Sequence, residues 1–112
     1  MNESVYKVSW TRKAKRDLED IIYFIAQDSL VNARKILDRL NKKASSLDKH
    51  PWRGRIVPEL SRGGYESCRE LIVKPYRIFY KVHEHKVHVI SVLDSRRDLE
   101  DLLLERLLRE GE

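Results

Sequence analysis

Residues 69–82, RELIVKPYRIFYKV, contain two runs of alternating side chains that meet at Lys74-Pro75. Alternation with a period of two is typical of β-strands, because successive side chains point to opposite faces of a sheet. The short interval between the runs predicts an antiparallel hairpin. One face of the second run carries Tyr76, Ile78, Tyr80 and Val82, and the other carries Arg77, Phe79 and Lys81. The stretch therefore predicts a sheet with one apolar face and one face that combines cations with an aromatic ring.

Two amphipathic helices are predicted before this hairpin. The first is capped by Thr11 and ends near Gln27, and the second follows a break and cap at Asp28 or Ser29. In both segments apolar residues recur at intervals of three and four, which places them on one helix face. These residues are Leu18, Ile21, Ile22 and Ile25 in the first helix and Ala33, Ile36, Leu37, Leu40, Ala44 and Leu47 in the second. The connection is so short that the helices must pack antiparallel.

The remaining segments complete the predicted order of strand, helix, helix, strand, strand, strand, helix. We expect strands at 5–10, 68–73, 76–82 and 87–93, an irregular stretch at 51–64 with a short strand at 56–57, and a helix from Asp98. This order predicts an α+β fold, with a helical hairpin packed on one face of a small, mostly antiparallel twisted sheet. At 112 residues the chain is expected to form one domain, 1–112, with 94–112 as a C-terminal segment.

The composition narrows the possible locations and partners. No apolar run approaches the roughly 20 residues of a membrane-spanning helix, and the single cysteine, Cys68, cannot form an internal disulfide. We therefore expect a cytoplasmic protein with no membrane partner. The net charge is +5, divided between residues 1–93 (19 basic and 11 acidic, +8) and residues 94–112 (four basic and seven acidic, −3). The body of the chain is therefore the part suited to an anionic partner.

The second sheet face offers candidate contact residues. Arginine binds phosphate through two hydrogen bonds, and an exposed aromatic ring stacks on an unpaired base, so Arg77, Phe79 and Lys81 suit single-stranded RNA or an acidic protein. In the alternative interpretation the two cations are merely solvated and Phe79 packs beneath the C-terminal helix. Alternation alone does not distinguish these interpretations.

The position of Arg69 depends on strand register. A two-residue turn at Lys74-Pro75 pairs Val73 with Tyr76 and puts Arg69 opposite Tyr80, on the helix side of the sheet. One extra loop residue or a bulge instead brings Arg69 beside Arg77. The pair Arg96-Arg97 follows the last predicted strand and either reaches the open face or lies at the start of the tail helix.

Other clusters carry weaker signals. The residues His83, His85 and His88 lack a fourth ligand, so a solvated turn is favoured, and we expect no metal and no cofactor. Cys68 is expected to be a buried small residue rather than a nucleophile. The first helical turn holds Arg12, Lys13, Lys15 and Arg16, cations that the helix macrodipole opposes. A solvated face is the favoured interpretation of this turn, and a contact surface is the alternative.

Four segments, taken together and in order, resemble the RelE/ParE superfamily of toxins from bacterial type II toxin–antitoxin systems. They are WTRKAKRDLEDIIYFIAQDS (10–29), HPWRGRIVPEL (50–60), RELIVKPYRIFYKV (69–82) and VHVISVLDSRRDLEDLL (87–103). The resemblance implies a helical hairpin on a small sheet. It also implies a cognate antitoxin that wraps its C-terminal segment around the toxin in a hetero-oligomer.

The superfamily has two main activities. RelE-like members cut messenger RNA in the ribosomal A site without a metal, and ParE-like members inhibit DNA gyrase. By resemblance Arg77 matches the arginine of the nuclease motif, Arg69 lies near the strand lysines, and Arg96 lies near the arginine after the last strand. Nuclease members usually carry a C-terminal tyrosine or histidine, and this chain has neither after His88.

The resemblance therefore favours a ParE-like gyrase inhibitor that is not a nuclease. The alternatives are a RelE-like, ribosome-dependent endoribonuclease, whose catalytic candidates would be Arg69, Arg77 and Arg96, and a diverged member that only binds antitoxin. Candidate residues for contact with target or antitoxin are Arg77, Phe79, Lys81, Arg96, Arg97, Arg12 and Arg16.

Overall fold

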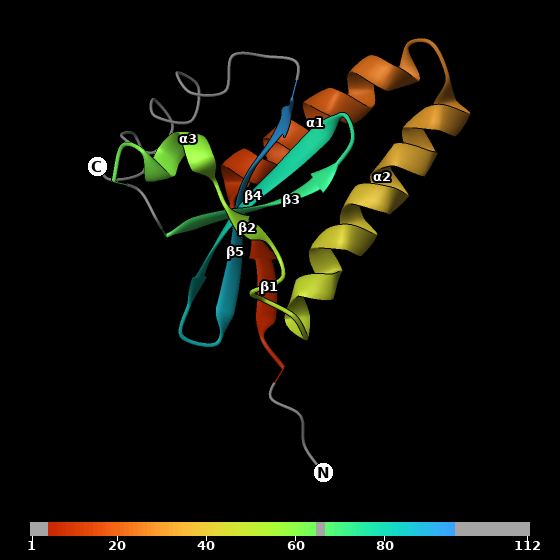
Figure 1. The fold of residues 1–112 in the computed structure, drawn as a ribbon. Coiled ribbons are helices and arrows are strands. Elements are labelled where there is room, and N and C mark those ends of the chain that lie inside the picture. The colour runs from red at the N-terminus through yellow and green to blue at the C-terminus, as the bar shows by residue number, and fades with distance from the viewer. Residues whose placement is uncertain (1–4, 65–66, 96–112) are drawn as a thin grey trace.

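A computed structural model describes residues 5–64 and 67–95, which form a sheet covered on one face by two long helices (Figure 1). The elements, in chain order, are β1 (Lys7–Trp10), α1 (Arg12–Ala26), α2 (Leu30–Ser45), the 3₁₀ turn η1 (Ser46–Asp48), β2 (Arg55–Ile56), α3 (Pro58–Ser61), β3 (Cys68–Val73), β4 (Tyr76–His83) and β5 (Lys86–Asp94). The predicted helix from Asp98 lies outside the described residues.

The sheet has the strand order β1-β5-β4-β3-β2. The pairs β2–β3, β3–β4 and β4–β5 are antiparallel, and the pair β1–β5 is parallel. The predicted α+β fold with a mostly antiparallel sheet is confirmed.

Each long helix begins at a hydroxyl cap. The Thr11 side chain accepts a hydrogen bond from the backbone N–H of Ala14 at 3.1 Å, and Ser29 accepts one from Asn32 at the same distance. Both caps satisfy an N–H group that has no partner within the helix. The predicted cap at Thr11 is confirmed, and of the two candidates for the second helix the structure selects Ser29.

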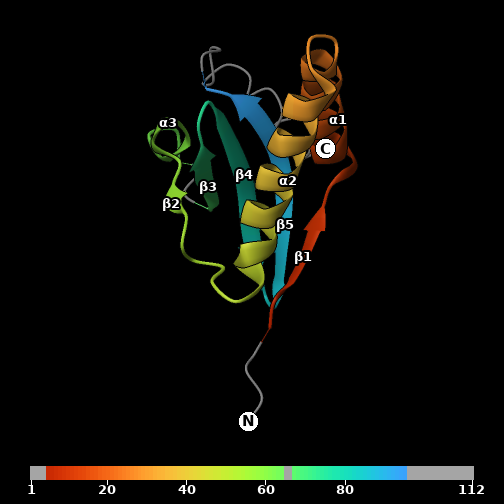
Figure 2. The ribbon, with the colours of Figure 1, turned by 90° about the vertical axis from the view of Figure 1, so that its right-hand side faces the viewer.

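The helical hairpin lies against one face of the sheet (Figure 2). The larger of two apolar clusters is built from residues of these two layers. It includes Leu40 of α2, Leu47 of η1, and Ile78, Tyr80 and Val89 of the sheet, all without exposed surface. Each side chain of this kind contributes about 1.5–3 kcal/mol when it is fully buried. This cluster is the main core.

A second apolar cluster lies on the other face of the sheet, beneath α3. It consists of Val57, Leu60, Cys68, Phe79, Ile90 and Leu93. The expectation that this face is open is therefore wrong over this area. So is the expectation that 51–64 is irregular apart from a strand at 56–57, because β2 is Arg55–Ile56 and a helical turn follows it. Pro58 favours that turn, because its fixed φ suits the first residue of a helix.

Candidate functional site

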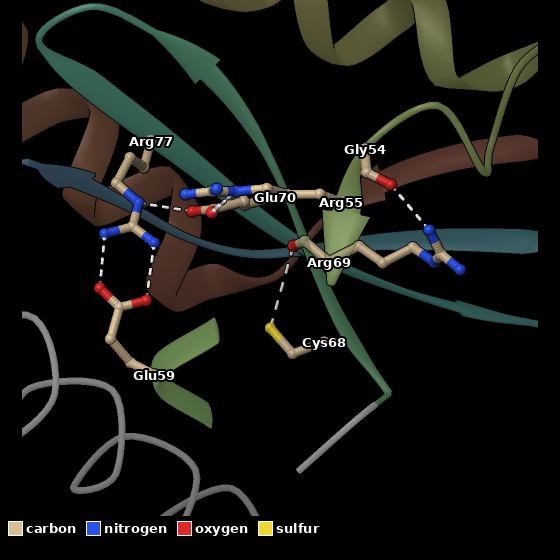
Figure 3. Close-up of polar contacts among 7 residues, drawn as sticks. All are labelled: Gly54, Arg55, Glu59, Cys68, Arg69, Glu70 and Arg77. Atoms are coloured by element: carbon tan, nitrogen blue, oxygen red, sulfur yellow. Dashed lines mark hydrogen bonds and ion pairs between the residues drawn. The ribbon is translucent and has the colours of Figure 1, made fainter. Parts of the chain in front are cut away.

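The charged residue at the centre of the second face is Arg77 on β4, and it is held by two carboxylates (Figure 3). Its Nη1 and Nη2 donate to the two oxygens of Glu59 on α3, at 2.9 and 3.0 Å. Its Nε donates to Oε1 of Glu70 on β3, and Arg55 Nε on β2 donates to Oε2 of the same carboxylate at 2.6 Å. Two arginines and two glutamates thus form one ion-pair network across four elements.

This network lies mostly out of solvent. The side chain of Glu70 is fully buried and that of Arg77 is 8% exposed. A buried charge is tolerated only when it is paired and hydrogen-bonded. This condition is met, because Arg77 donates two hydrogen bonds to Glu59, and Glu70 accepts hydrogen bonds from both Arg55 and Arg77.

The pKa values reflect the pairing. The hydrogen bond from Arg77 outweighs the opposing effect of burial and lowers the pKa of Glu59 to about 2. Burial disfavours the charge of Arg77, but the hydrogen bonds to Glu59 and Glu70 outweigh it, so the pKa of Arg77 is raised. Arg77 is therefore a permanent cation whose charge is already neutralised inside the protein.

The expectation that Arg77 and Phe79 face solvent is wrong. Phe79 has no exposed surface, and its ring lies 5.2 Å from the Arg77 guanidinium. The alternative in which Phe79 packs beneath a helix is closer, because Phe79 shares an apolar cluster with Val57 and Leu60 of the α3 region. The C-terminal helix named in that alternative lies outside the described residues. Of the three predicted residues, Arg77 and Phe79 are buried and Lys81 is partly exposed.

Arg69 and Arg77 lie on opposite faces of the sheet. Val73 pairs with Tyr76 and Arg69 with Tyr80, as the two-residue turn requires. Arg69 instead points to the loop after η1, where its Nη1 donates to the carbonyl oxygen of Gly54 at 2.7 Å (Figure 3). The two arginines therefore do not form one site.

The remaining candidates in the described part of the chain lie apart from the network. Arg12 and Arg16 are exposed on α1, and Arg96 and Arg97 lie outside the described residues. In the described ranges 5–64 and 67–95 no group of histidine, cysteine or carboxylate side chains is arranged to hold a metal ion. Cys68 is buried, and its Sγ lies 3.9 Å from the Arg69 carbonyl oxygen.

Sequence reasoning missed the two carboxylates of the network. Glu70 occupies a position in β3 whose alternation with Cys68 marks it as inward-facing, so a carboxylate there signals a buried cationic partner. Glu59 carries no comparable signal, because it lies in a four-residue helix too short to show periodicity.

No helix in the described part of the chain is both long and apolar enough to cross a membrane.

Comparison with known proteins places the sequence in a family. Residues 8–99 match the model of the ParE toxin of the type II toxin–antitoxin system parDE. The chain is 35% identical over 92 residues to the toxin RelE2 of Caulobacter vibrioides, covering 81% of this chain and 97% of the relative. It is 26% identical over 99 residues to the putative toxin Y4kP of Sinorhizobium fredii, covering 87% and 96%.

Two solved structures share the fold. A chain of the chromosomal ParDE toxin–antitoxin system from P. aeruginosa superposes with a TM-score of 0.68 at 18% identity, covering 82% of this chain and 98% of that chain. A chain of the RelBE2 toxin–antitoxin complex from Mycobacterium tuberculosis gives 0.60 at 23% identity, covering 83% and 94%. With the family match over 8–99, these likenesses agree with the predicted superfamily: the protein belongs to the ParE family of toxins of type II toxin–antitoxin systems.

Proposed function

We propose that this toxin arrests growth by inhibiting DNA gyrase in the cytoplasm through protein contact, without cutting RNA, and that a cognate antitoxin neutralises it in a hetero-oligomer. The observation that carries the proposal is the pairing of Arg77 with Glu59 and Glu70. A nuclease of the RelE type would use this arginine to stabilise a phosphate. Here Nε, Nη1 and Nη2 each donate a hydrogen bond to a carboxylate, which supports a role for this arginine in the fold.

The proposed gyrase-contact surface includes α1. Arg12 and Arg16 are exposed, and the first turn of α1 contains no acidic residue. Cations at a helix N-terminus oppose the macrodipole and cost about 0.3–1 kcal/mol each. A contact with a partner gives a reason for keeping charges that do not stabilise the helix. Lys81, Arg96 and Arg97 remain further candidates for contacts with the target or antitoxin.

A RelE-like ribonuclease is the second candidate, because the relative with 35% identity is named RelE2. In that case the catalytic candidates remain Arg69, Arg77 and Arg96, although Arg69 and Arg77 lie on opposite faces of the sheet.

The deciding experiment is a paired assay of purified toxin freed of antitoxin. Gyrase supercoiling and cleavage-complex formation are measured beside messenger RNA cutting on programmed ribosomes. We expect gyrase inhibition with intact message, and we expect Arg12→Glu/Arg16→Glu to weaken the inhibition at least tenfold. The matched control is Arg62→Glu/Lys86→Glu, which makes the same change of charge at exposed positions on other elements. Cut message with normal gyrase activity would replace the gyrase proposal by the ribonuclease one.

A further inference from the structure

A cationic groove of about 550 Å³ lies between α2 and the C-terminal end of β3. Its lining residues are Arg39, Lys42, Lys43, Ser46, Arg53, Ile72, Val73 and Lys74. A shallow depression of about 640 Å³ shares Arg53 with it and is lined by Lys49, His50, Pro51, Trp52 and Arg53. Among these described residues six are lysine or arginine and none is a carboxylate. The two hollows thus meet at Arg53, and their linings together form a basic surface.

The three cations of α2 that line the groove lie on one side of the helix. Arg39, Lys42, Lys43 and Ser46 follow the spacing i, i+3, i+4 and i+7, which is one face of an α-helix. Like charges at this spacing destabilise a helix by about 0.2–0.5 kcal/mol per pair. An ion pair within α2, between Arg34 and Asp38, lies nearer the start of the helix. Lys42 and Lys43 lie in the last turn of α2, where the helix macrodipole favours cations, and this effect offsets the repulsion. The groove therefore gathers positive charge on one face of the helix.

Hydrogen bonds fix the loop that forms the far wall of this surface. Arg53 Nη1 donates to Ser46 Oγ at 2.8 Å, and Ser46 Oγ donates to the Lys43 carbonyl oxygen at 2.6 Å. Behind the loop, the Gly54 N–H donates to Tyr80 Oη at 2.9 Å. Because Arg53 is already positioned, binding a ligand there costs less side-chain entropy than ordering a free arginine would.

Trp52 adds an aromatic surface at the end of the groove. Its side chain is 57% exposed, and the Arg69 guanidinium lies 5.1 Å from the ring centroid. Arg69 also holds the loop through the carbonyl oxygen of Gly54. The indole is therefore supported from within the protein and presented to solvent beside several cations.

We propose that this surface binds single-stranded nucleic acid, with Trp52 stacking on a base and Arg39, Lys42, Lys43 and Arg53 contacting phosphates. A basic groove beside an aromatic ring suits this ligand, because base stacking contributes about 1–3 kcal/mol per base and cations follow the backbone. An acidic peptide would satisfy the cations but leave the indole unused. The bases of a duplex are already stacked on one another and are not free to stack on Trp52.

The site is distinct from the gyrase-contact surface proposed on α1. The combination of cations with an aromatic ring, which the sequence predicts at Arg77, Phe79 and Lys81, is found here at other residues, around the exposed Trp52.

Fluorescence anisotropy of a labelled 20-nucleotide oligo-dT with purified toxin tests this inference. For Trp52→Ala we expect the Kd to rise about 5- to 150-fold, the equivalent of 1–3 kcal/mol, whereas Trp52→Phe keeps an aromatic ring and most of the affinity. Lys42→Glu/Lys43→Glu should raise the Kd at least tenfold and make the dependence of log K on log salt shallower, since each lost phosphate contact removes about 0.7 from the slope. Thermal melting of each variant checks the fold.

The control is again Arg62→Glu/Lys86→Glu, which leaves the groove unchanged and should bind within about threefold of wild type because only the distant field changes. Equal affinity of the Trp52→Ala and wild-type proteins would overturn the stacking role. Competition by poly-glutamate as strong as that by unlabelled oligo-dT would indicate an acidic peptide as the ligand, and equal affinity for a 20-base-pair duplex would indicate unspecific attraction. Loss of oligonucleotide binding with full gyrase inhibition would show that the two proposals stand separately.

Discussion

Arg77 and Glu59 join β4 to α3 through two parallel hydrogen bonds of 2.9 and 3.0 Å. Charge-assisted pairs of this geometry are the strong ones among protein hydrogen bonds. A helix of four residues has almost no stability of its own, since helix formation requires a costly nucleus. The ion pair and the buried side chain of Leu60 therefore hold α3 on the sheet.

The first prediction concerns this pair. Arg77→Ala removes one of the two arginines that pair with the fully buried Glu70 and removes both bonds to Glu59, while the pair of Glu70 with Arg55 remains. We expect the free energy of unfolding to fall by about 3–5 kcal/mol, measured by urea denaturation. Arg77→Lys keeps the charge without the fork and should lose less. A change below about 1 kcal/mol in the alanine variant would contradict a structural role for the network.

The second prediction is a pH dependence that Glu59 imposes. Its pKa in the folded protein is about 2, below the usual 4.5. The native state therefore binds fewer protons at this group than the unfolded state does, so the stabilisation is complete above about pH 4.5 and is lost as the pH falls towards 2. Urea midpoints of wild type and Glu59→Gln at several pH values should differ at pH 6 and converge near pH 2. If the two midpoints differed by the same amount at every pH, the substitution would act through the shape of the side chain and not through its charge.

The third prediction concerns the close packing at Gly54. A Cβ at this position would lie 2.5 Å from both the Glu70 carbonyl oxygen and Tyr80 Oη. The carbonyl belongs to a paired strand and cannot move easily, so Gly54→Ala should cost about 1–3 kcal/mol. Tyr80→Phe removes the acceptor of the Gly54 N–H and should cost about 1–3 kcal/mol. Because both changes act on one contact, the double variant should lose less than the sum in chemical denaturation.

The fourth prediction tests the location of Phe79. The ring has no exposed surface, so Phe79→Ala should lower the free energy of unfolding by about 3–5 kcal/mol. The matched control is Phe24→Ala on α1, where the ring is 76% exposed and a change within about 0.5 kcal/mol is expected. If both substitutions had equally small effects, the conclusion that Phe79 is buried would be wrong.

Local patterns were enough to predict the two long helices, the cap at Thr11 and the three-strand meander. Thr11 and Ser29 act through atoms three residues away, and the alternation in 69–82 depends only on strand geometry. The turn at Lys74-Pro75 had two possible registers, and the pairing of Val73 with Tyr76 selects one of them. Register was open because it depends on tertiary packing as well as on the sequence of the turn.

The site was less predictable, because its contacts join residues distant in sequence. Glu59 and Arg77 are 18 positions apart, and nothing near either residue indicates the other. The burial of Phe79 depends on Leu60 and Val57, which lie in a stretch without periodicity. Trp52 lies in the stretch 51–64 that was predicted to be irregular. Its proximity to the cations of α2 depends on the tertiary fold and has no local sequence signal.

The last prediction concerns the way in which Asp17 attaches α1 to β5. Strand β1 pairs with β5 only as far as Trp10 opposite Val89. Beyond this point Asp17 Oδ2 accepts hydrogen bonds from Ser91 Oγ at 2.9 Å and from the Val92 N–H at 3.2 Å, so the carboxylate satisfies an N–H that β1 does not reach. Asp17→Ala should cost about 1–3 kcal/mol because a buried donor loses its partner, whereas Asp17→Asn retains an acceptor oxygen and should lose less. Amide hydrogen exchange gives the specific readout: exchange at Val92 should accelerate in Asp17→Ala more than exchange at Val87, whose strand pairing with β1 is intact. Uniform acceleration along β5 would mean that the substitution lowers global stability without exposing this edge.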